Sequence, residues 1–81
     1  SLHQAILALE QGDPGAAATR LENLRARPGA PAITDYYLAH AYLRLEREAE
    51  ARAAFERFIS AWEGDGALVE ESKTILQRLA P

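Results

Sequence analysis

The chain has 81 residues, of which 48% are hydrophobic and 26% charged, the composition of one small globular domain rather than of a disordered segment. Nine Lys and Arg are scattered among twelve Asp and Glu, and the net charge of −3 argues against nucleic acid as a partner, because phosphate binding needs a clustered basic face. The sequence has no cysteine for a disulfide or thiolate site, and no apolar run approaches the roughly 18 residues of a membrane span, so we expect no membrane insertion.

Turn-forming residues divide the chain into five segments. Glycine and proline mark breaks at 12–15, 27–31 and 64–66, and a weaker break without either residue lies near 46–48. Asp13 is expected to cap a helix that has Pro14 at its first position, and Asp65 is expected to cap the last helix.

Apolar residues recur at helical spacing in every segment, and no alternation typical of a strand competes with them. The third segment, residues 33–45, is apolar almost all round and is expected to lie between other helices. We therefore predict an all-α fold of about five short helices. The apolar stripes of the other four are Leu2, Ala5, Ile6 and Leu9; Ala17, Leu21 and Leu24; Ala51, Phe55, Phe58, Ile59 and Trp62; and Leu68, Val69, Ser72, Ile75, Leu76 and Leu79.

A shift of the sequence by 34 positions aligns residues of the same kind. It also places the break at Gly12 on Glu46. A period in this range indicates stacked helical units that bury a core only through their neighbours. The aligned pairs are Ala5 with Ala39, Leu9 with Leu43, Ala17 with Ala51, Glu22 with Glu56, Leu21 with Phe55, and Leu24 with Phe58.

The second unit resembles the tetratricopeptide repeat. The pattern of that family has a large aliphatic residue, a small residue and a tyrosine in the first helix, then an alanine and a phenylalanine four apart in the second. Small residues at positions 39 and 51 would let the two helices approach closely. Asp35 stands where the family usually has an aromatic residue, and it can instead cap the third helix. The matching residues are Leu38, Ala39, Tyr42, Ala51 and Phe55.

The resemblance implies a right-handed α-α superhelix of antiparallel helix pairs in one domain spanning residues 1–81. Repeat one covers about 1–30, repeat two about 31–64, and a capping helix about 66–80. The first repeat departs further from the pattern, with Gln4 and Ala8 where leucine and tyrosine are expected. Trp62 and Glu63 stand where a closing proline is usual.

In that family the first helix of each repeat lines a concave groove for a peptide or helix of another protein, which implies a scaffold or adaptor role. Tyr36 and Tyr37 combine apolar area with a hydroxyl group, although either can instead pack between helices. Arg44 can meet a carboxylate of the ligand. Glu70 and Glu71 favour some positive charge at one end of the ligand, unless they only form a solvated face of their helix. The expected groove residues are Ile6, Glu10, Ile33, Tyr36, Tyr37, His40 and Arg44, with His3, Glu70, Glu71 and Thr74 beside them.

The ligand is expected to be apolar or mixed in character. Family members that clamp a C-terminal carboxylate carry lysine and asparagine at positions that hold Leu2, Ile6, Tyr36 and His40 in this chain. We expect no enzyme and no cofactor, because the sequence has no Ser/His/Asp motif, glycine-rich phosphate loop or HExxH motif. Two histidines without a third ligand also make a poor metal site.

Two alternatives to peptide binding stay open. Two repeats are fewer than the three that usually make such an array stable, so the domain can form a homodimer or dock on a preceding domain. Residues 55–79 are also similar to the C-terminal repeat tails of some bacterial signalling kinases and regulators, and the richness in alanine and arginine suits a bacterial source. Since the chain begins at Ser1 rather than Met, we interpret it as a fragment; a cytoplasmic location is favoured but not fixed.

Overall fold

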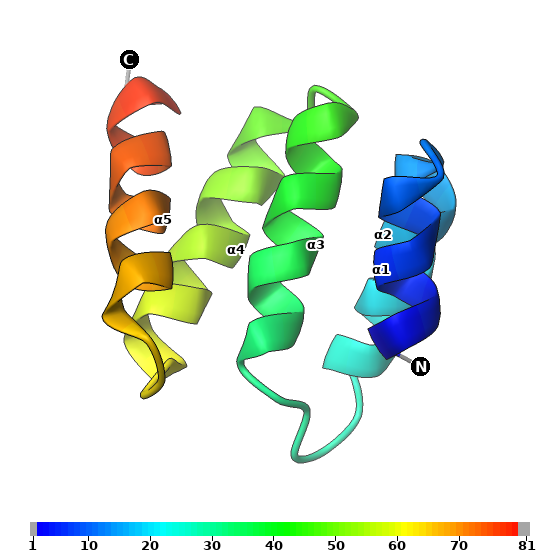
Figure 1. Cartoon of the computed structure of the whole chain (residues 1–81), viewed down its shortest axis with the longest axis horizontal. Helices are drawn as coiled ribbons and strands as arrows, with labels where there is room; N and C mark the ends of the chain where they lie inside the picture. The colour runs from blue at the N-terminus through cyan, green and yellow to red at the C-terminus, as the bar shows by residue number, and fades with distance from the viewer. Residues whose placement is uncertain (1, 80–81) are drawn as a thin grey trace.

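The computed structural model describes residues 2–79, and this part of the chain forms five α-helices and no strand (Figure 1). The predicted all-α class and the number of helices are confirmed. The ends of the predicted domain, at positions 1, 80 and 81, lie outside the described residues. The helices are α1 (Leu2–Glu10), α2 (Pro14–Arg25), α3 (Ile33–Arg44), α4 (Glu48–Ala61) and α5 (Gly66–Leu79).

Helix α3 is the centre of the arrangement. It packs against α4 and α2 and also touches α1, whereas α5 packs on α4. In Figure 1, α1, α3 and α5 lie toward the viewer, and α2 and α4 lie behind them. The expectation that the apolar third segment lies between other helices is therefore correct.

The core is built where small residues let helices come close. Four alanines that the 34-residue shift relates in pairs are completely buried, and the large side chains of Leu21 and Phe55 fill the space beside them. Without a bulky side chain at these crossings, the backbones of neighbouring helices approach closely enough for dense packing. The four alanines are Ala5, Ala17, Ala39 and Ala51.

The turns that end α1 and α3 have the same geometry, 34 residues apart. Gly12 has φ of 81°, and Glu46, the only non-glycine residue of the described chain with positive φ, has φ of 60°. In each turn the next amide donates to a carbonyl five residues earlier, the helix-ending arrangement that places a left-handed residue after the last turn. These bonds join Asp13 N to Ala8 O at 2.8 Å and Arg47 N to Tyr42 O at 2.9 Å.

Because the left-handed conformation disfavours a side chain, we expect Glu46→Gly to raise the free energy of unfolding by about 0.5–1 kcal/mol. In the other turn, Gly12→Ala should lower the free energy of unfolding by about 1 kcal/mol, because alanine is strained in the left-handed conformation. Nothing lies within 4 Å of the added Cβ, so this strain is the whole expected effect. Chemical denaturation followed by circular dichroism measures both. Effects of the same sign in the two turns would contradict their equivalence.

Both predicted N-caps are confirmed. Asp13 Oδ1 accepts a hydrogen bond from Ala16 N at 3.1 Å, with Pro14 at the first helical position. Asp65 Oδ1 accepts from Ala67 N at 2.9 Å. Each carboxylate satisfies an amide that has no partner within its own helix, which fixes where α2 and α5 begin.

Asp35 joins three helices instead of capping α3. Its Oδ1 lies 3.2 Å from Arg25 Nε of α2 and 3.1 Å from Arg57 Nη2 of α4, and only 15% of its side chain is exposed. The residue at the N-cap position of α3 is Ala32, which makes no side-chain cap, so the capping alternative is wrong. The carboxylate stands where the family pattern has an aromatic residue, and here two guanidinium groups balance its charge.

Candidate functional site

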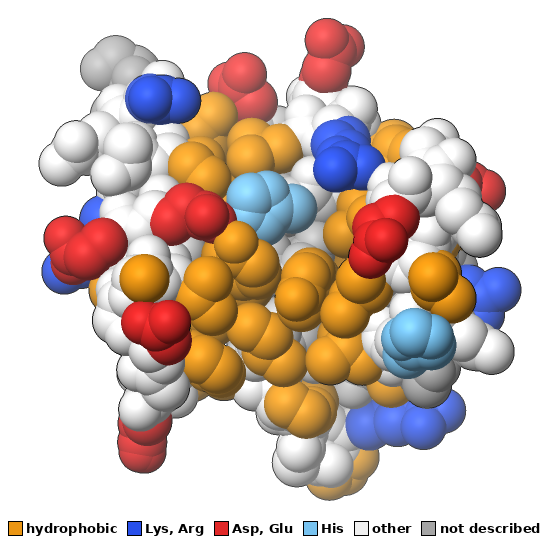
Figure 2. Space-filling model, viewed as in Figure 1, with side chains coloured by type: hydrophobic (Ala, Val, Ile, Leu, Met, Phe, Trp, Pro, Cys, Tyr) orange, Lys and Arg blue, Asp and Glu red, His pale blue; other side chains and the backbone are white. Residues whose placement is uncertain are grey.

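Hydrophobic side chains gather on one side of the molecule. Figure 2 shows them over α3, between α5 and α1, on the side where those three helices face the viewer. Helical spacing places the predicted residues of α3 together on one side of the helix. We call this surface the front face, which consists of Ile33, Tyr36, Tyr37 and His40 of α3, all partly exposed, with Glu71 of α5 at one edge. Helix α1 borders α3 on the other side, and we assign the predicted Ile6 and Glu10 to that edge.

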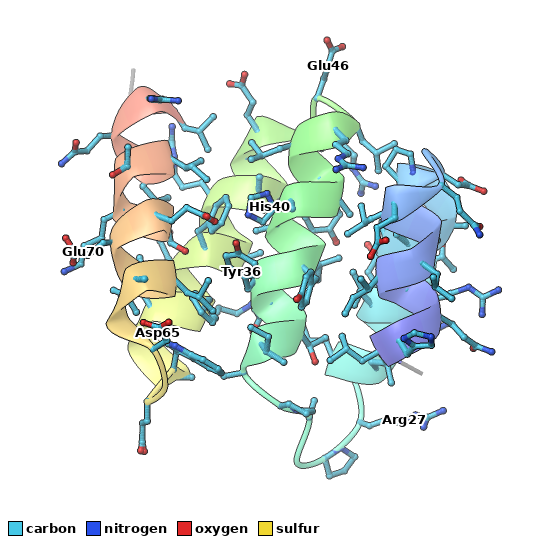
Figure 3. All side chains as sticks on the ribbon, viewed as in Figure 1. Arg27, Tyr36, His40, Glu46, Asp65 and Glu70 are labelled. Carbon is cyan, nitrogen blue, oxygen red and sulfur yellow. The ribbon has the colours of Figure 1, made fainter. Side chains whose placement is uncertain are left out.

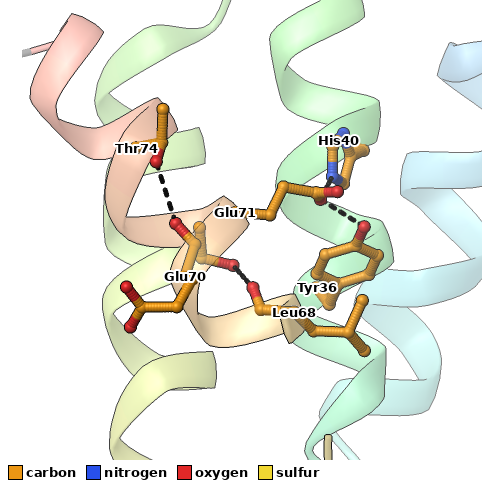
Figure 4. A network of polar contacts seen from close by, with 7 residues as sticks. Tyr36, His40, Leu68, Glu70, Glu71 and Thr74 are labelled. Atoms are coloured by element: carbon orange, nitrogen blue, oxygen red, sulfur yellow. Dashed lines mark hydrogen bonds and ion pairs between the residues drawn. The ribbon is translucent and has the colours of Figure 1, made fainter. Parts of the chain in front are cut away.

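At the α5 edge of the front face, a polar contact joins α3 and α5 (Figure 4). Tyr36 Oη donates a hydrogen bond to Glu71 Oε2, and His40 Nε2 lies 3.2 Å from the same oxygen. The side chain of His40 is 31% exposed and that of Glu71 is 44% exposed. Two side chains one turn apart on α3 therefore hold a single carboxylate of α5 at the surface.

The aromatic residues of the front face pack on the core with one side and face solvent with the other. The Tyr36 ring lies 5.3 Å from that of Tyr37 and 5.2 Å from that of Phe58, in edge-on and tilted arrangements. The His40 ring lies 5.4 Å from that of Phe55. Since Phe55 and Phe58 are completely buried, these contacts hold the exposed rings in fixed positions.

Arg44 connects α3 to the end of α1. Its Nη1 donates to the carbonyl oxygen of Leu9 at 2.5 Å. That carbonyl belongs to the last turn of α1, where carbonyls have no partner within the helix. Part of the guanidinium that the sequence suggested for a ligand carboxylate is thus used inside the fold.

The predicted residues of α5 do not act together. Glu71 contacts α3, whereas Glu70 points away from it (Figure 3) and lies 3.6 Å from Lys73 Nζ. Thr74 Oγ1 donates to the backbone carbonyl of Glu70 within α5. The expectation that Glu70 lines the groove beside Glu71 is wrong, because the rotation of α5 about its axis turns Glu71 toward α3 and Glu70 away from it.

On α1, the predicted residues Ile6 and Glu10 are one turn apart and share a side of the helix. That side is turned away from Gln4, Ala8 and Gln11, which line a surface hollow of about 280 Å³ between α1 and α2. His3 is exposed near the start of α1.

Two surface hollows lie away from the front face. Besides the hollow between α1 and α2, a second of about 180 Å³ is lined by four residues of α2 and the turn after it. Neither was expected from the sequence, and both are lined by a mixture of polar and apolar residues. Their residues are Gln4, Leu7, Ala8, Gln11, Asp13, Ala16 and Arg20 in the first, and Arg20, Asn23, Leu24 and Arg27 in the second.

Comparison with known proteins gives no counterpart: no family model, no curated protein and no solved structure matches the chain. Among residues 2–79, no three His, Asp or Glu side chains are grouped in a way that could hold a metal ion. None of the five helices is long and apolar enough to cross a membrane.

Two tyrosines give the fold a dependence on alkaline pH. Burial, together with the hydrogen bond that Tyr42 Oη donates to Glu22 Oε2 at 2.5 Å, raises the pKa of Tyr42 to about 12. Burial and the bond to Glu71 raise the pKa of Tyr36 as well. The folded state therefore holds these phenolic protons more tightly than the unfolded chain, in which a tyrosine has a pKa of about 10.

We expect this stabilisation to be complete below about pH 10 and to be lost as pH rises from about 10 to 12. Denaturation curves at a series of pH values measure the loss. It should be less steep in the double variant Tyr36→Phe/Tyr42→Phe, which carries neither phenol. An equally steep loss in that variant would assign the alkaline transition to other groups.

Proposed function

We propose that this chain is a domain of the tetratricopeptide repeat type that binds a peptide or helix of another protein on its front face. The observation that carries the proposal is the apolar and aromatic surface over α3, partly exposed between α1 and α5. Aromatic side chains held by a core lose little conformational freedom on binding, and such residues dominate the energetics of protein interfaces.

The repeat assignment is supported by three features that recur after 34 residues. Alanines that the shift aligns are completely buried in both halves, the aligned Leu21 and Phe55 are completely buried as well, and the turns after α1 and α3 have the same backbone geometry. In a tandem array of this kind, the first helices of successive units line one surface together. The residues of the front face belong to α1, α3 and α5, which would be the first helices of successive units in such an array.

Self-association is the second candidate, and its supporting observation is Leu7. This side chain is 38% exposed and borders the hollow between α1 and α2. The surrounding surface favours contact with water, however: the 34-residue shift places Gln4 on Leu38 and Arg20 on Ala54, so polar groups replace buried apolar ones. We therefore favour a different protein as the partner. Sedimentation over a concentration series distinguishes the two, since a dimer that Leu7→Asp dissociates would support self-association.

Selection from a library of random linear peptides, followed by fluorescence anisotropy with the selected peptides, tests binding at the front face. We expect Tyr37→Ala and Ile33→Ala each to weaken binding by about tenfold or more, because both remove apolar area from the centre of the surface. Circular dichroism checks that the variants are folded. The matched control is Glu56→Ala, an exposed position on α4, which should leave the affinity unchanged. Peptides that bind all three variants as they bind the parent, or a library without binders, would contradict the proposal.

A further inference from the structure

We infer that the partner segment carries a lysine or arginine next to an apolar residue, and that this cation binds Glu71 while the apolar residue lies on Tyr36 and Tyr37. The inference rests on the proposed function, because it specifies the chemistry of a ligand on the same front face.

Glu71 is held in position but keeps acceptor capacity. Tyr36 and His40 both contact Oε2, and no residue of the described chain donates to Oε1. A carboxylate offers about four lone-pair sites on its two oxygens, so a further donor can bind without displacing the internal ones. With 44% of its side chain exposed, Glu71 is within reach of a partner. A carboxylate whose orientation is already fixed loses little conformational entropy when a cation binds it.

The charge around the front face favours a cation. Residues 62–72 carry four acids and no lysine or arginine, and Asp65 and Glu70 lie along the α5 edge in Figure 3. At the opposite edge, α1 contributes Glu10. The one arginine of α3, Arg44, keeps its charge but is held toward α1 by its bond to the Leu9 carbonyl, whereas Glu71 lies on the α5 side of α3. The resulting negative potential attracts a basic segment and opposes an acidic one.

The rings beside Glu71 support the same ligand chemistry. Tyr36 and Tyr37 contact each other edge-on and remain partly exposed, which provides apolar area for a neighbouring side chain. A lysine or arginine that reaches Glu71 over these rings also gains from the interaction of a cation with an aromatic face. An acidic side chain at this place would meet a carboxylate and lose hydration without compensation.

The peptides selected from the random library provide the test. We expect them to combine Leu, Ile, Phe or Trp with an adjacent Lys or Arg. Glu71→Gln should weaken their binding by roughly 3–10-fold, because glutamine still accepts from Tyr36 and His40 but has no charge for the ligand. Glu70→Gln is the matched control: it makes the same chemical change one residue away, on a side chain that points away from α3, and should have no effect.

A double-mutant cycle adds a second measurement. Replacing the basic residue of the peptide with glutamine should reduce the affinity clearly less in the Glu71→Gln protein than in the Glu70→Gln protein, because the charge that pairs with this residue is already absent from Glu71→Gln. Selected peptides that lose affinity with Tyr37→Ala but are acidic or neutral, or that ignore Glu71→Gln, would overturn this inference and leave the proposed function intact. Peptides that are insensitive to Tyr37→Ala would overturn both.

Discussion

Replacing Phe55 with alanine is expected to lower the free energy of unfolding by about 3–5 kcal/mol, the usual cost of removing a buried aromatic side chain from a close-packed core. Phe55 is completely buried in the middle of α4, and its ring lies against that of His40 on α3. Little rearrangement can fill the resulting space, because buried alanines already bring the helices together there. A domain of this size has a total stability of only about 4–12 kcal/mol, so a large part of it would be lost.

Urea denaturation followed by circular dichroism measures the loss as a lower midpoint with a similar slope. Leu7→Ala is the control, since that side chain is 38% exposed and its truncation should cost less than about 1 kcal/mol. If both truncations cost the same, Phe55 would not be the core residue that the structure describes.

The second large effect is expected when small buried residues of the close-packed core are replaced with larger ones. Ala17→Leu and Ala51→Leu should each lower the free energy of unfolding by about 1–3 kcal/mol, because a larger side chain at a helix crossing forces the backbones apart. Both alanines are completely buried, and the 34-residue shift aligns one with the other. Ala49→Leu, at an exposed position of α4, is the matched control and should change the stability by less than about 0.5 kcal/mol.

The comparison between the two alanines also tests the equivalence of the helix pairs. Similar losses at positions 17 and 51, measured in the same denaturation experiment, are expected if both crossings have the same geometry. A loss at only one of them would show that the 34-residue spacing of the sequence does not extend to the packing.

The helices themselves could be predicted because their signals are local. A capping carboxylate such as Asp13 acts on amides two or three residues away, and the spacing of apolar residues reports which side of a helix is buried. The break near Glu46 has no glycine or proline, yet the 34-residue shift aligned it with Gly12, and both residues adopt positive φ. The same shift related the fully buried alanines to one another.

The details of the front face depend on side-chain contacts that no local signal reveals. The pairing of Asp35 with Arg25 and Arg57 requires three helices in place, and the use of Arg44 by the Leu9 carbonyl requires the end of α1 beside α3. The rotation of α5 is set by its packing on α4. For that reason the sequence placed Glu70 and Glu71 together, whereas only Glu71 reaches α3.

The attachment of α5 has a consequence for how tightly any partner can bind. Ser72 is its only completely buried residue; Ile75 and Leu76 pack against the core but stay partly exposed, and polar contacts join Glu71 to α3 and the Leu79 carbonyl to Arg52 of α4. A helix whose apolar side chains are only partly buried, and which packs mainly on one neighbour, opens locally at a lower free energy than the centre of a domain. One edge of the front face is therefore a helix that can detach, and a ligand on Glu71 shifts that equilibrium toward the closed form. The observed affinity is therefore lower than the affinity of the closed form. Substitutions that strengthen the packing of α5 on α4 should raise the observed affinity although they do not contact the ligand.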